Sequence, residues 1–322
     1  MLFCQLGRAH SLREIEGGLK SCEGKLAHLG IEAPARSSLS YANAHRPWQL
    51  FEQVFHGLYD KVAAKATGKR KFRFKNKLVS IDSTVIDLSL SMYDWAKYQR
   101  TKGAVKLHLV LDHDGYLPCF GVVTDGKVAD VKVAQWIDFG AGTIVVDDRG
   151  YNDYGLFGQW CTQGVFFVTR MKRDALYEVV QEREPPQNRT IVRDQTIRLS
   201  SAGAHGKCPH LLRRVEAVRE DTGETLVFLT NLHHLGASTI AAIYKDRWQI
   251  ELFFDCLSYC TPSYVIEYQG SAGPRRELTG FERLERQEIH RDRPGEWSTA
   301  RCGRLAWPQG PSGGSVAARW ST

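Results

Sequence analysis

The sequence of 322 residues lacks any apolar run of about 18 residues, so we expect no transmembrane helix. It also lacks a basic leader followed by an apolar stretch, which argues against a signal peptide. The eight cysteines have no framework spacing, and we interpret Cys4, Cys22, Cys119 and Cys161 as free or buried thiols of a reducing compartment. These absences favour a cytoplasmic protein over a membrane or secreted one.

The charge and composition are those of an ordinary globular protein with a basic surplus. Hydrophobic residues make up 43% of the chain and charged residues 25%. The net charge of +7 mildly favours a polyanionic partner such as nucleic acid. At this length we expect more than one domain.

Residues 1–66 are predicted to form a helical domain. Ser11 and Glu14 have the spacing of a capping box, and a further helix is predicted to begin at Pro47. The apolar stripe expected to be buried on that helix consists of Leu50, Phe51, Val54, Phe55 and Leu58. The domain could bind DNA, with Arg36, Ser37, Ser38 and Tyr41 facing outward, or it could be a helical cap, and the sequence leaves both open.

A basic segment, "KATGKRKFRFKNK", follows the helical domain. It includes Lys69, Arg70, Lys71 and Arg73, and two phenylalanines alternate with the charges. Such a run suits contact with a phosphate backbone. A solvated linker or an edge strand is an equally good interpretation.

From residue 67 the periodicity predicts an α/β fold. The expected order through residue 176 is three strands linked as hairpins, then helix, strand, helix and strand, which implies a mixed sheet with flanking helices. Residues 177–231 are predicted to be a β-rich insertion, and residues 232–258 a helix capped by Ser238 or Thr239. Residues 259–322 are rich in Gly, Pro, Arg and Ser without a sustained period, and we expect a disordered or out-of-frame tail.

Three carboxylates occupy positions that suit metal chemistry. Asp82 is predicted in mid-strand among apolar residues, Asp148 at the end of an apolar strand, and Glu251 on the late helix. Together they could hold divalent ions that act on a phosphodiester. Each has a plainer role available: Asp82 could cap a turn, Asp148 could pair with Arg149, and Glu251 could pair with Arg247.

Three motifs, "SIDSTVIDL", "DDRGY" and "YKDRWQIELFF", together resemble the DDE transposases of bacterial insertion sequences, in particular the IS-four family. Tyr244, Arg247 and Glu251 match the first three positions of the family pattern Y-x2-R-x3-E-x6-K. The resemblance extends from about Ser11 to Phe254 and includes a β-rich insertion before the last helix.

The resemblance implies a ribonuclease-H-like core in which Asp82, Asp148 and Glu251 are the catalytic, metal-binding triad. Asp148 is preferred to Asp147 because the family aspartate directly precedes Arg-Gly-Tyr. Two Mg²⁺ (or Mn²⁺) ions are expected. The implied partners are double-stranded DNA at terminal inverted repeats, target DNA and a second subunit in a homodimer, with the protein nucleoid-associated when bound to DNA.

The resemblance further implies that the side chains beside the triad bind DNA. Tyr244 and Arg247 would contact phosphates near the transposon end. Trp248 could stack on a base, although a packed core position is the alternative. The implied reaction is hydrolysis at the transposon end, followed by direct attack of the freed 3′-hydroxyl on a phosphodiester. The resemblance implies that the element is released by cut-and-paste.

The chain departs from the family at one position. Ser258 stands where the family has its lysine, and the resemblance ends at about Asp255. With the abrupt start, this predicts a truncated, frameshifted copy with impaired activity. A non-catalytic DNA-binding repressor and a ribonuclease-H-like nuclease without strand transfer remain the alternative functions.

Two weaker signals concern histidines. His205, Cys208 and His210 lie close in sequence, but zinc sites normally need a second pair of ligands. His108 alternates with apolar residues along a predicted strand, and we expect a structural role for it.

Overall fold

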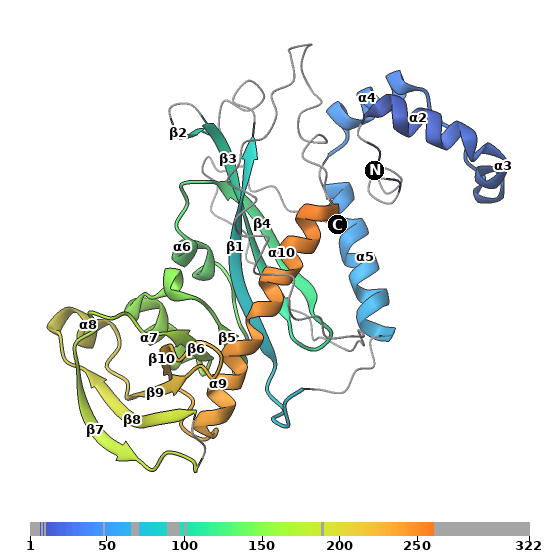
Figure 1. Ribbon diagram of the computed structural model, residues 1–322. Helices are drawn as coiled ribbons and strands as arrows, with labels where there is room; N and C mark the ends of the chain where they lie inside the picture. Colours follow the sequence, from blue (N-terminus) through green and yellow to red (C-terminus); the bar gives the residue numbers. More distant parts are fainter. Residues whose placement is uncertain are drawn as a thin grey trace.

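The computed structural model describes residues 7, 9, 11–47, 49–65, 71–88, 97–99, 102–187 and 190–260. These residues form a mixed α/β fold around one large sheet of ten strands, with helices on its faces (Figure 1). The sheet positions the candidate site, because the site's side chains lie on its central strands and on the helix that crosses them.

The central strands have the order β4-β3-β1-β5-β6. β1, β3 and β4 are antiparallel neighbours, whereas β5 is parallel to β1 and β6 is parallel to β5. This arrangement is that of a ribonuclease-H-like sheet, so the predicted fold class is confirmed. The strands are β1 (Leu78–Leu88), β3 (Lys102–Asp112), β4 (Leu117–Asp125), β5 (Ile144–Val146) and β6 (Phe166–Arg170), and a short β2 (Lys97–Gln99) pairs with β3.

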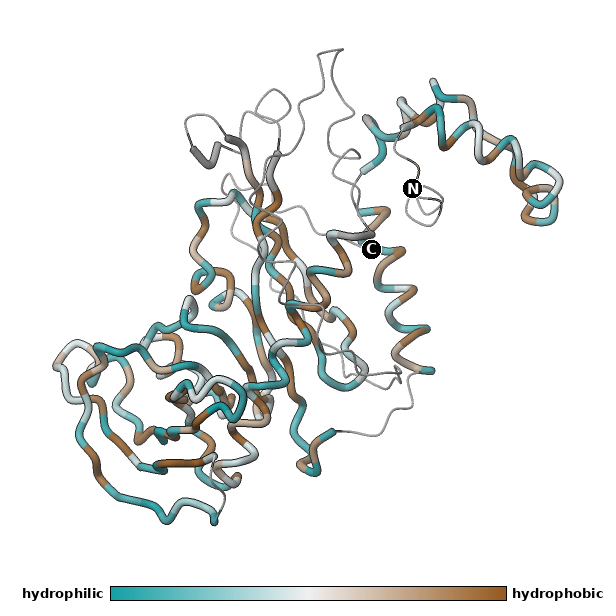
Figure 2. Tube along the Cα trace, in the orientation of Figure 1, coloured by the Kyte–Doolittle hydropathy of each residue, from teal (hydrophilic) through white to brown (hydrophobic). Residues whose placement is uncertain are grey.

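Alternating side chains give the sheet two buried faces. Val79 and Val145 belong to one core cluster together with Phe157 and Trp160 of α7. Leu78 and Ile144, their neighbours in sequence, belong to a second cluster on the other face. Figure 2 shows the hydrophobic residues along the central strands. The helices are α6 (Asp130–Ala134), α7 (Tyr154–Gln163), α9 (Ala237–Asp246) and α10 (Trp248–Cys260).

The late helix differs from the prediction in two ways. The N-cap is Gly236, which offers no side chain, so the expected cap at Ser238 or Thr239 was wrong. The single predicted helix is also divided at Arg247 into α9 and α10. The division arises because the Arg247 amide donates to the Tyr244 carbonyl and the Ile250 amide to the Arg247 carbonyl, both three residues back, which tightens the turn.

The β-rich insertion is confirmed and extends the same sheet, because β10 pairs with β6. Its strands are β7 (Tyr177–Arg183), β8 (Ile191–Leu199), β9 (Leu212–Val218) and β10 (Thr225–Thr230). The sequence predicts paired strands at "HLLRRVEAV" and "ETLVFLTN", and β9 and β10 do pair. The sequence also predicts a loop at "SSAGAHGKCPH", but this segment contains helix α8 (Ala202–Lys207). That prediction was wrong because the Ser201 side chain caps the helix and Ala204 is buried, which outweighs the two glycines.

The N-terminal part is helical, as predicted, with α2 (Leu12–Ser21), α3 (Glu23–Leu26), the 3-10 turn η1 (Ala27–Leu29), α4 (Arg36–His45) and α5 (Gln49–Lys65). The Ser11 side chain accepts from the Glu14 amide, which confirms the cap. On α5 Phe55 is buried, but Leu50, Val54 and Leu58 are exposed, so the predicted buried stripe was wrong for these three. The covered side of α5 instead includes Phe55 and Ala63.

Other predictions have simple outcomes. Lys69, Arg70, Cys4 and the tail from 261 to 322 lie outside the described residues. Cys22, Cys119 and Cys161 are in no disulfide bond. Phe72 and Phe74 stack on each other, with ring centroids 5.2 Å apart, and pack against the core cluster beneath α9. The aromatic alternation of the basic segment therefore serves packing.

No helix of the described ranges is long and apolar enough to span a membrane.

Candidate active site

Asp82 lies in the middle of β1 and is almost completely buried. Its strand neighbour Ile81 points into the core, so alternation directs Asp82 to the opposite face, where α10 crosses β1. One carboxylate oxygen accepts from the Ser83 amide at 2.8 Å. The other accepts from Arg247, so Asp82 pairs with a charged group rather than capping a turn.

Two aspartates follow β5 at its carboxyl end. The Asp148 Oδ1 accepts from the Gly150 amide at 2.7 Å and so caps the 3-10 turn η2 (Arg149–Tyr151). Asp147 is fully buried. Burial raises the pKa of Asp147 well above its ordinary value, an effect that the nearby Thr169 hydroxyl opposes. Neither Asp147 oxygen has a hydrogen-bond partner of good geometry among the described residues; the Thr169 hydroxyl donates to the Asp148 carbonyl at 3.2 Å.

Arg247 connects the helix to the strand. Its Nη1 donates to Asp82 Oδ2 at 2.5 Å and to Glu251 Oε1 at 3.3 Å. The side chains of Arg247 and Asp82 are only 12% and 13% exposed, whereas Glu251 is 39% exposed. The guanidinium also lies 5.7 Å from the centre of the Tyr244 ring. Glu251 and Arg247 thus form the i,i+4 ion pair that the sequence offered as the plainer role of Glu251, and Arg247 forms a second ion pair with Asp82.

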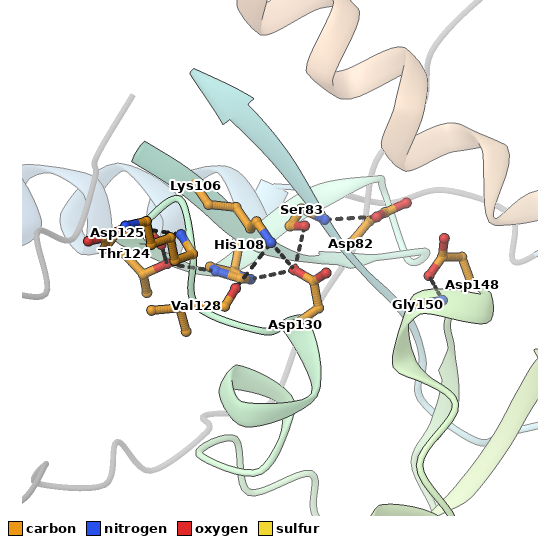
Figure 3. Close-up of polar contacts among 11 residues, drawn as sticks. Asp82, Ser83, Lys106, His108, Thr124, Asp125, Val128, Asp130, Asp148 and Gly150 are labelled. Carbon is orange, nitrogen blue, oxygen red and sulfur yellow. Dashed lines mark hydrogen bonds and ion pairs between the residues drawn. The ribbon is translucent and has the colours of Figure 1, made fainter. Parts of the chain in front are cut away.

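The three carboxylates of the predicted triad share one electrostatic environment. Burial raises the pKa of Asp82 to about 7, Arg247 opposes the rise, and the charges of Glu251 and Asp148 add to it. Figure 3 shows the carboxyl groups of Asp82 and Asp148 turned toward the same space near α10. Within the described ranges, however, no three His, Cys, Asp or Glu side chains already form a metal-binding group. The fold brings Asp82 and Glu251 to the same guanidinium, that of Arg247, and places Asp148 near enough for its charge to act on Asp82.

The remaining predicted site residues lie around this centre. Trp248 is 53% exposed, so its alternative interpretation as a core residue was wrong. Tyr244 is half-buried against Phe228, with ring centroids 4.8 Å apart. Arg73 is exposed, and Lys71 forms an ion pair with Asp246.

Sequence reasoning missed two acidic residues beside the site. Asp130 accepts from the Ser83 hydroxyl at 2.7 Å and from Lys106 at 3.3 Å (Figure 3). Asp246 is buried in a second polar cluster next to Arg247. Nothing in the local sequence marks either residue, since their partners are distant in the chain.

The two histidine predictions also have outcomes. His108 is buried and pairs with the Thr124 hydroxyl at 2.9 Å, as a structural residue does. The segment with His205, Cys208 and His210 forms no three-residue metal group among the described residues.

Comparisons with known proteins give consistent results. The family model described as "Transposase DDE domain" matches residues 73–260, and one described as "Domain of unknown function (DUF4372)" matches residues 1–32. The transposase y4zB of Sinorhizobium fredii is 35% identical over 226 residues, which are 69% of this chain and 62% of that protein. A transposase for insertion sequence element IS5377 of Geobacillus stearothermophilus is 30% identical over 222 residues, which are 68% of this chain and 57% of that protein.

This chain therefore spans less than two thirds of the length of either relative. Among solved structures, a piggyBac transposase synaptic complex with hairpin DNA matches with a TM-score of 0.38 and 11% identity. The match covers 71% of this chain and 48% of that one.

Proposed function

Because the chain belongs to the transposase DDE domain family, we propose that it catalyses metal-dependent cleavage of DNA at insertion-sequence ends and transfer of the freed strand. The proposed catalytic residues are Asp82, Asp148 and Glu251. The observation that supports this assignment is that Arg247 hydrogen-bonds to both Asp82 and Glu251. The charge of Asp148 also acts on the Asp82 carboxyl.

The family generally uses divalent metal ions, and the three carboxylates fit two Mg²⁺ or Mn²⁺ ions in their chemistry. All their donor atoms are the hard oxygens that Mg²⁺ prefers. Burial is the main cause of the raised pKa of Asp82; Arg247 opposes the rise, and the negative charges of Glu251 and Asp148 add to it. A bound cation would stabilise the charged form of these neighbouring carboxylates. When bound, divalent ions polarise the scissile phosphodiester and activate the attacking oxygen.

The side chains of the site supply binding and orientation. Burial raises the pKa of Asp82 to about 7, so a proton competes with a cation for this carboxylate near neutral pH. Once Asp82 has another partner, the Arg247 guanidinium is available for a DNA phosphate, which it can bind through two parallel hydrogen bonds. Trp248 is exposed beside Arg247 and can stack on a base of the DNA end. Tyr244 packs beside Arg247 and orients it.

The wider DNA-binding surface is part of the same proposal. We assign phosphate contacts to Lys69, Arg70, Lys71 and Arg73 and a DNA-binding role to the helical residues 1–66. The proposed partners are terminal inverted repeats, target DNA and a second copy of the chain in a homodimer. A chain bound in this way would be associated with the nucleoid.

The departure at Ser258 predicts reduced activity. Ser258 is exposed on α10, seven residues after Glu251 and therefore about two helical turns further along the same side. The family's lysine would place a cation for DNA there. We expect Ser258→Lys to increase the rate of strand cleavage, measured on a labelled end fragment. An unchanged rate with Ser258→Lys would show that the missing lysine does not limit this chain.

Cleavage of DNA that carries the element's own end tests the proposal. The chain is expected to nick at the end in Mg²⁺ and not in EDTA, and Asp82→Asn, Asp148→Asn and Glu251→Gln should each abolish the nick. Asp221→Asn is the control, because Asp221 is exposed and pairs with Arg219 on the surface. Binding of the inverted repeat without cleavage would favour the repressor alternative. Cleavage that ignores the end sequence and gives no strand transfer would favour a nuclease.

A further inference from the structure

A second buried polar cluster lies one residue from Arg247. Asp246, the last residue of α9, has a side chain that is only 1% exposed. Its carboxylate accepts from His113 Nδ1 at 2.6 Å and from the Tyr116 hydroxyl at 3.1 Å and 3.3 Å. Lys71 forms an ion pair with the same carboxylate. These three donors stabilise the charged form of a buried carboxylate that would otherwise be costly.

The cluster joins α9 to the same strand that carries Asp82. His113 follows β3 in the turn to β4, and its Nε2 lies 2.7 Å from the hydroxyl of Ser80 on β1. Ser80 and Asp82 are two residues apart and therefore on one face of the strand. Two consecutive residues of the helix junction are thus connected to one face of β1. Asp246 is connected to Ser80 by way of His113, and Arg247 hydrogen-bonds to Asp82 itself.

The turn between β3 and β4, which supplies the donors His113 and Tyr116, has an unusual backbone. Tyr116 has a φ of 53°, the left-handed region that residues other than glycine seldom adopt. In that conformation its hydroxyl contacts Asp246. Strained residues of this kind persist where surrounding contacts over-determine them, often beside functional sites.

The position of Asp246 just before the helix junction lets it determine the directions of the site residues that follow it. The junction between α9 and α10 is at Arg247, and successive helical residues differ by about 100° in direction. Fixing Asp246 therefore fixes the directions of Arg247 and Glu251. If the junction rotated by one residue, Glu251 would no longer face Asp82.

We propose that Asp246 is a positioning residue that holds the start of α10 in the orientation in which Arg247 and Glu251 face Asp82. The proposal rests on the function proposed above, because the geometry it maintains is that of the metal-binding carboxylates. Because the Asp246 side chain is only 1% exposed, in this role it acts through Arg247 and Glu251 rather than by contact with DNA.

Titration of the full chain with Mn²⁺ tests this role without requiring activity. Asp246→Asn keeps the shape of the side chain and removes its charge, and we expect Mn²⁺ affinity to fall about 10-fold or more, as for other residues that orient metal ligands. The matched control is Asp194→Asn. Asp194 is similarly buried and ion-paired with Arg213, but it lies in the insertion. The control should bind Mn²⁺ with wild-type affinity even where it lowers the unfolding temperature.

A double mutant separates positioning from general destabilisation. In a Glu251→Gln background, Asp246→Asn should cause little further loss of affinity, because the group that it orients has already been removed. Should Asp246→Asn fail to fold, Tyr116→Phe removes one hydroxyl donor and should weaken Mn²⁺ binding in the same direction.

The outcomes distinguish the two proposals. Wild-type Mn²⁺ affinity in both Asp246→Asn and Tyr116→Phe, with loss in Glu251→Gln, overturns the positioning role alone. Equal losses in Asp246→Asn and Asp194→Asn overturn it as well, since they indicate only a stability effect. A wild-type chain that binds no Mn²⁺ refutes the proposed metal site and the positioning role together.

Discussion

Replacement of Arg247 by methionine is the most informative change to the site, because Arg247 is the cation that bridges Asp82 and Glu251. Removing one partner of a buried ion pair costs about 3–5 kcal/mol, since the other charge is left uncompensated. Asp82 and Arg247 are nearly buried, so solvent screens little of this cost, whereas the more exposed Glu251 adds less than about 1 kcal/mol. Protonation of Asp82 would reduce this free-energy cost, because burial already raises the pKa of Asp82 to about 7.

We therefore expect Arg247→Met to destabilise the chain by about 3 kcal/mol at alkaline pH, the lower end of that range. For a folded unit of this size, that corresponds to a fall of roughly 6–12 °C in the unfolding temperature. The assay is thermal unfolding followed by circular dichroism in EDTA. Added Mg²⁺ should recover more stability in the variant than in the wild type, because a divalent ion then binds the carboxylates without competition from the guanidinium. An unchanged unfolding temperature, or a loss that Mg²⁺ does not reduce, would refute the reasoning.

Three further predictions test other parts of the structure. Burial raises the pKa of Asp82 from 3.8 to about 7, so between these pH values the metal-free folded state holds a proton that the unfolded state releases. The free energy of unfolding should therefore fall as the pH rises from about 4 to about 7. Denaturant titrations should show a smaller fall for Asp82→Asn. Asp147→Asn should leave Mn²⁺ affinity unchanged in calorimetry, because Asp147 is fully buried and burial raises its pKa, which disfavours the charged form that a cation needs. Asp148→Asn should lose binding, and the reverse result would exchange the roles of the two residues. Gly158→Ala should lower the unfolding temperature, because the new methyl group would lie 2.2 Å from the Lys207 carbonyl oxygen. Overpacking of this kind costs about 1–3 kcal/mol. The control is Gly203→Ala, whose methyl group meets open space and should be neutral or slightly stabilising.

The sequence predicted those parts of the fold that depend on local pattern. The change from helical to alternating period located β1, and the position of Asp82 within it, because a strand's faces follow directly from its sequence. The choice of Asp148 over Asp147 came from the motif. The structure adds a physical difference between them, with Asp147 buried and Asp148 at the start of a turn.

Other features depend on contacts that no local pattern reveals. The periodicity of α5 marks Leu50, Val54 and Leu58 as one stripe, but it cannot show that another side of the helix is covered. Asp246 and His113 are separated by 133 positions in the chain, so their hydrogen bond becomes visible only when the sheet has formed. The break at Arg247 is likewise set by hydrogen bonds that pure helical spacing does not predict.

The central claim is that Asp82, Asp148 and Glu251 act together as ligands of divalent ions. Calorimetric titration of the full chain with Mn²⁺ tests it most directly, because binding can be measured whether or not the chain cleaves DNA. We expect two ions per chain. Asp82→Asn, Asp148→Asn and Glu251→Gln should each lose more affinity than the roughly 10-fold expected for an orienting residue. Mn²⁺ binding that is absent in the wild type, or that all three substitutions leave unchanged, would contradict it.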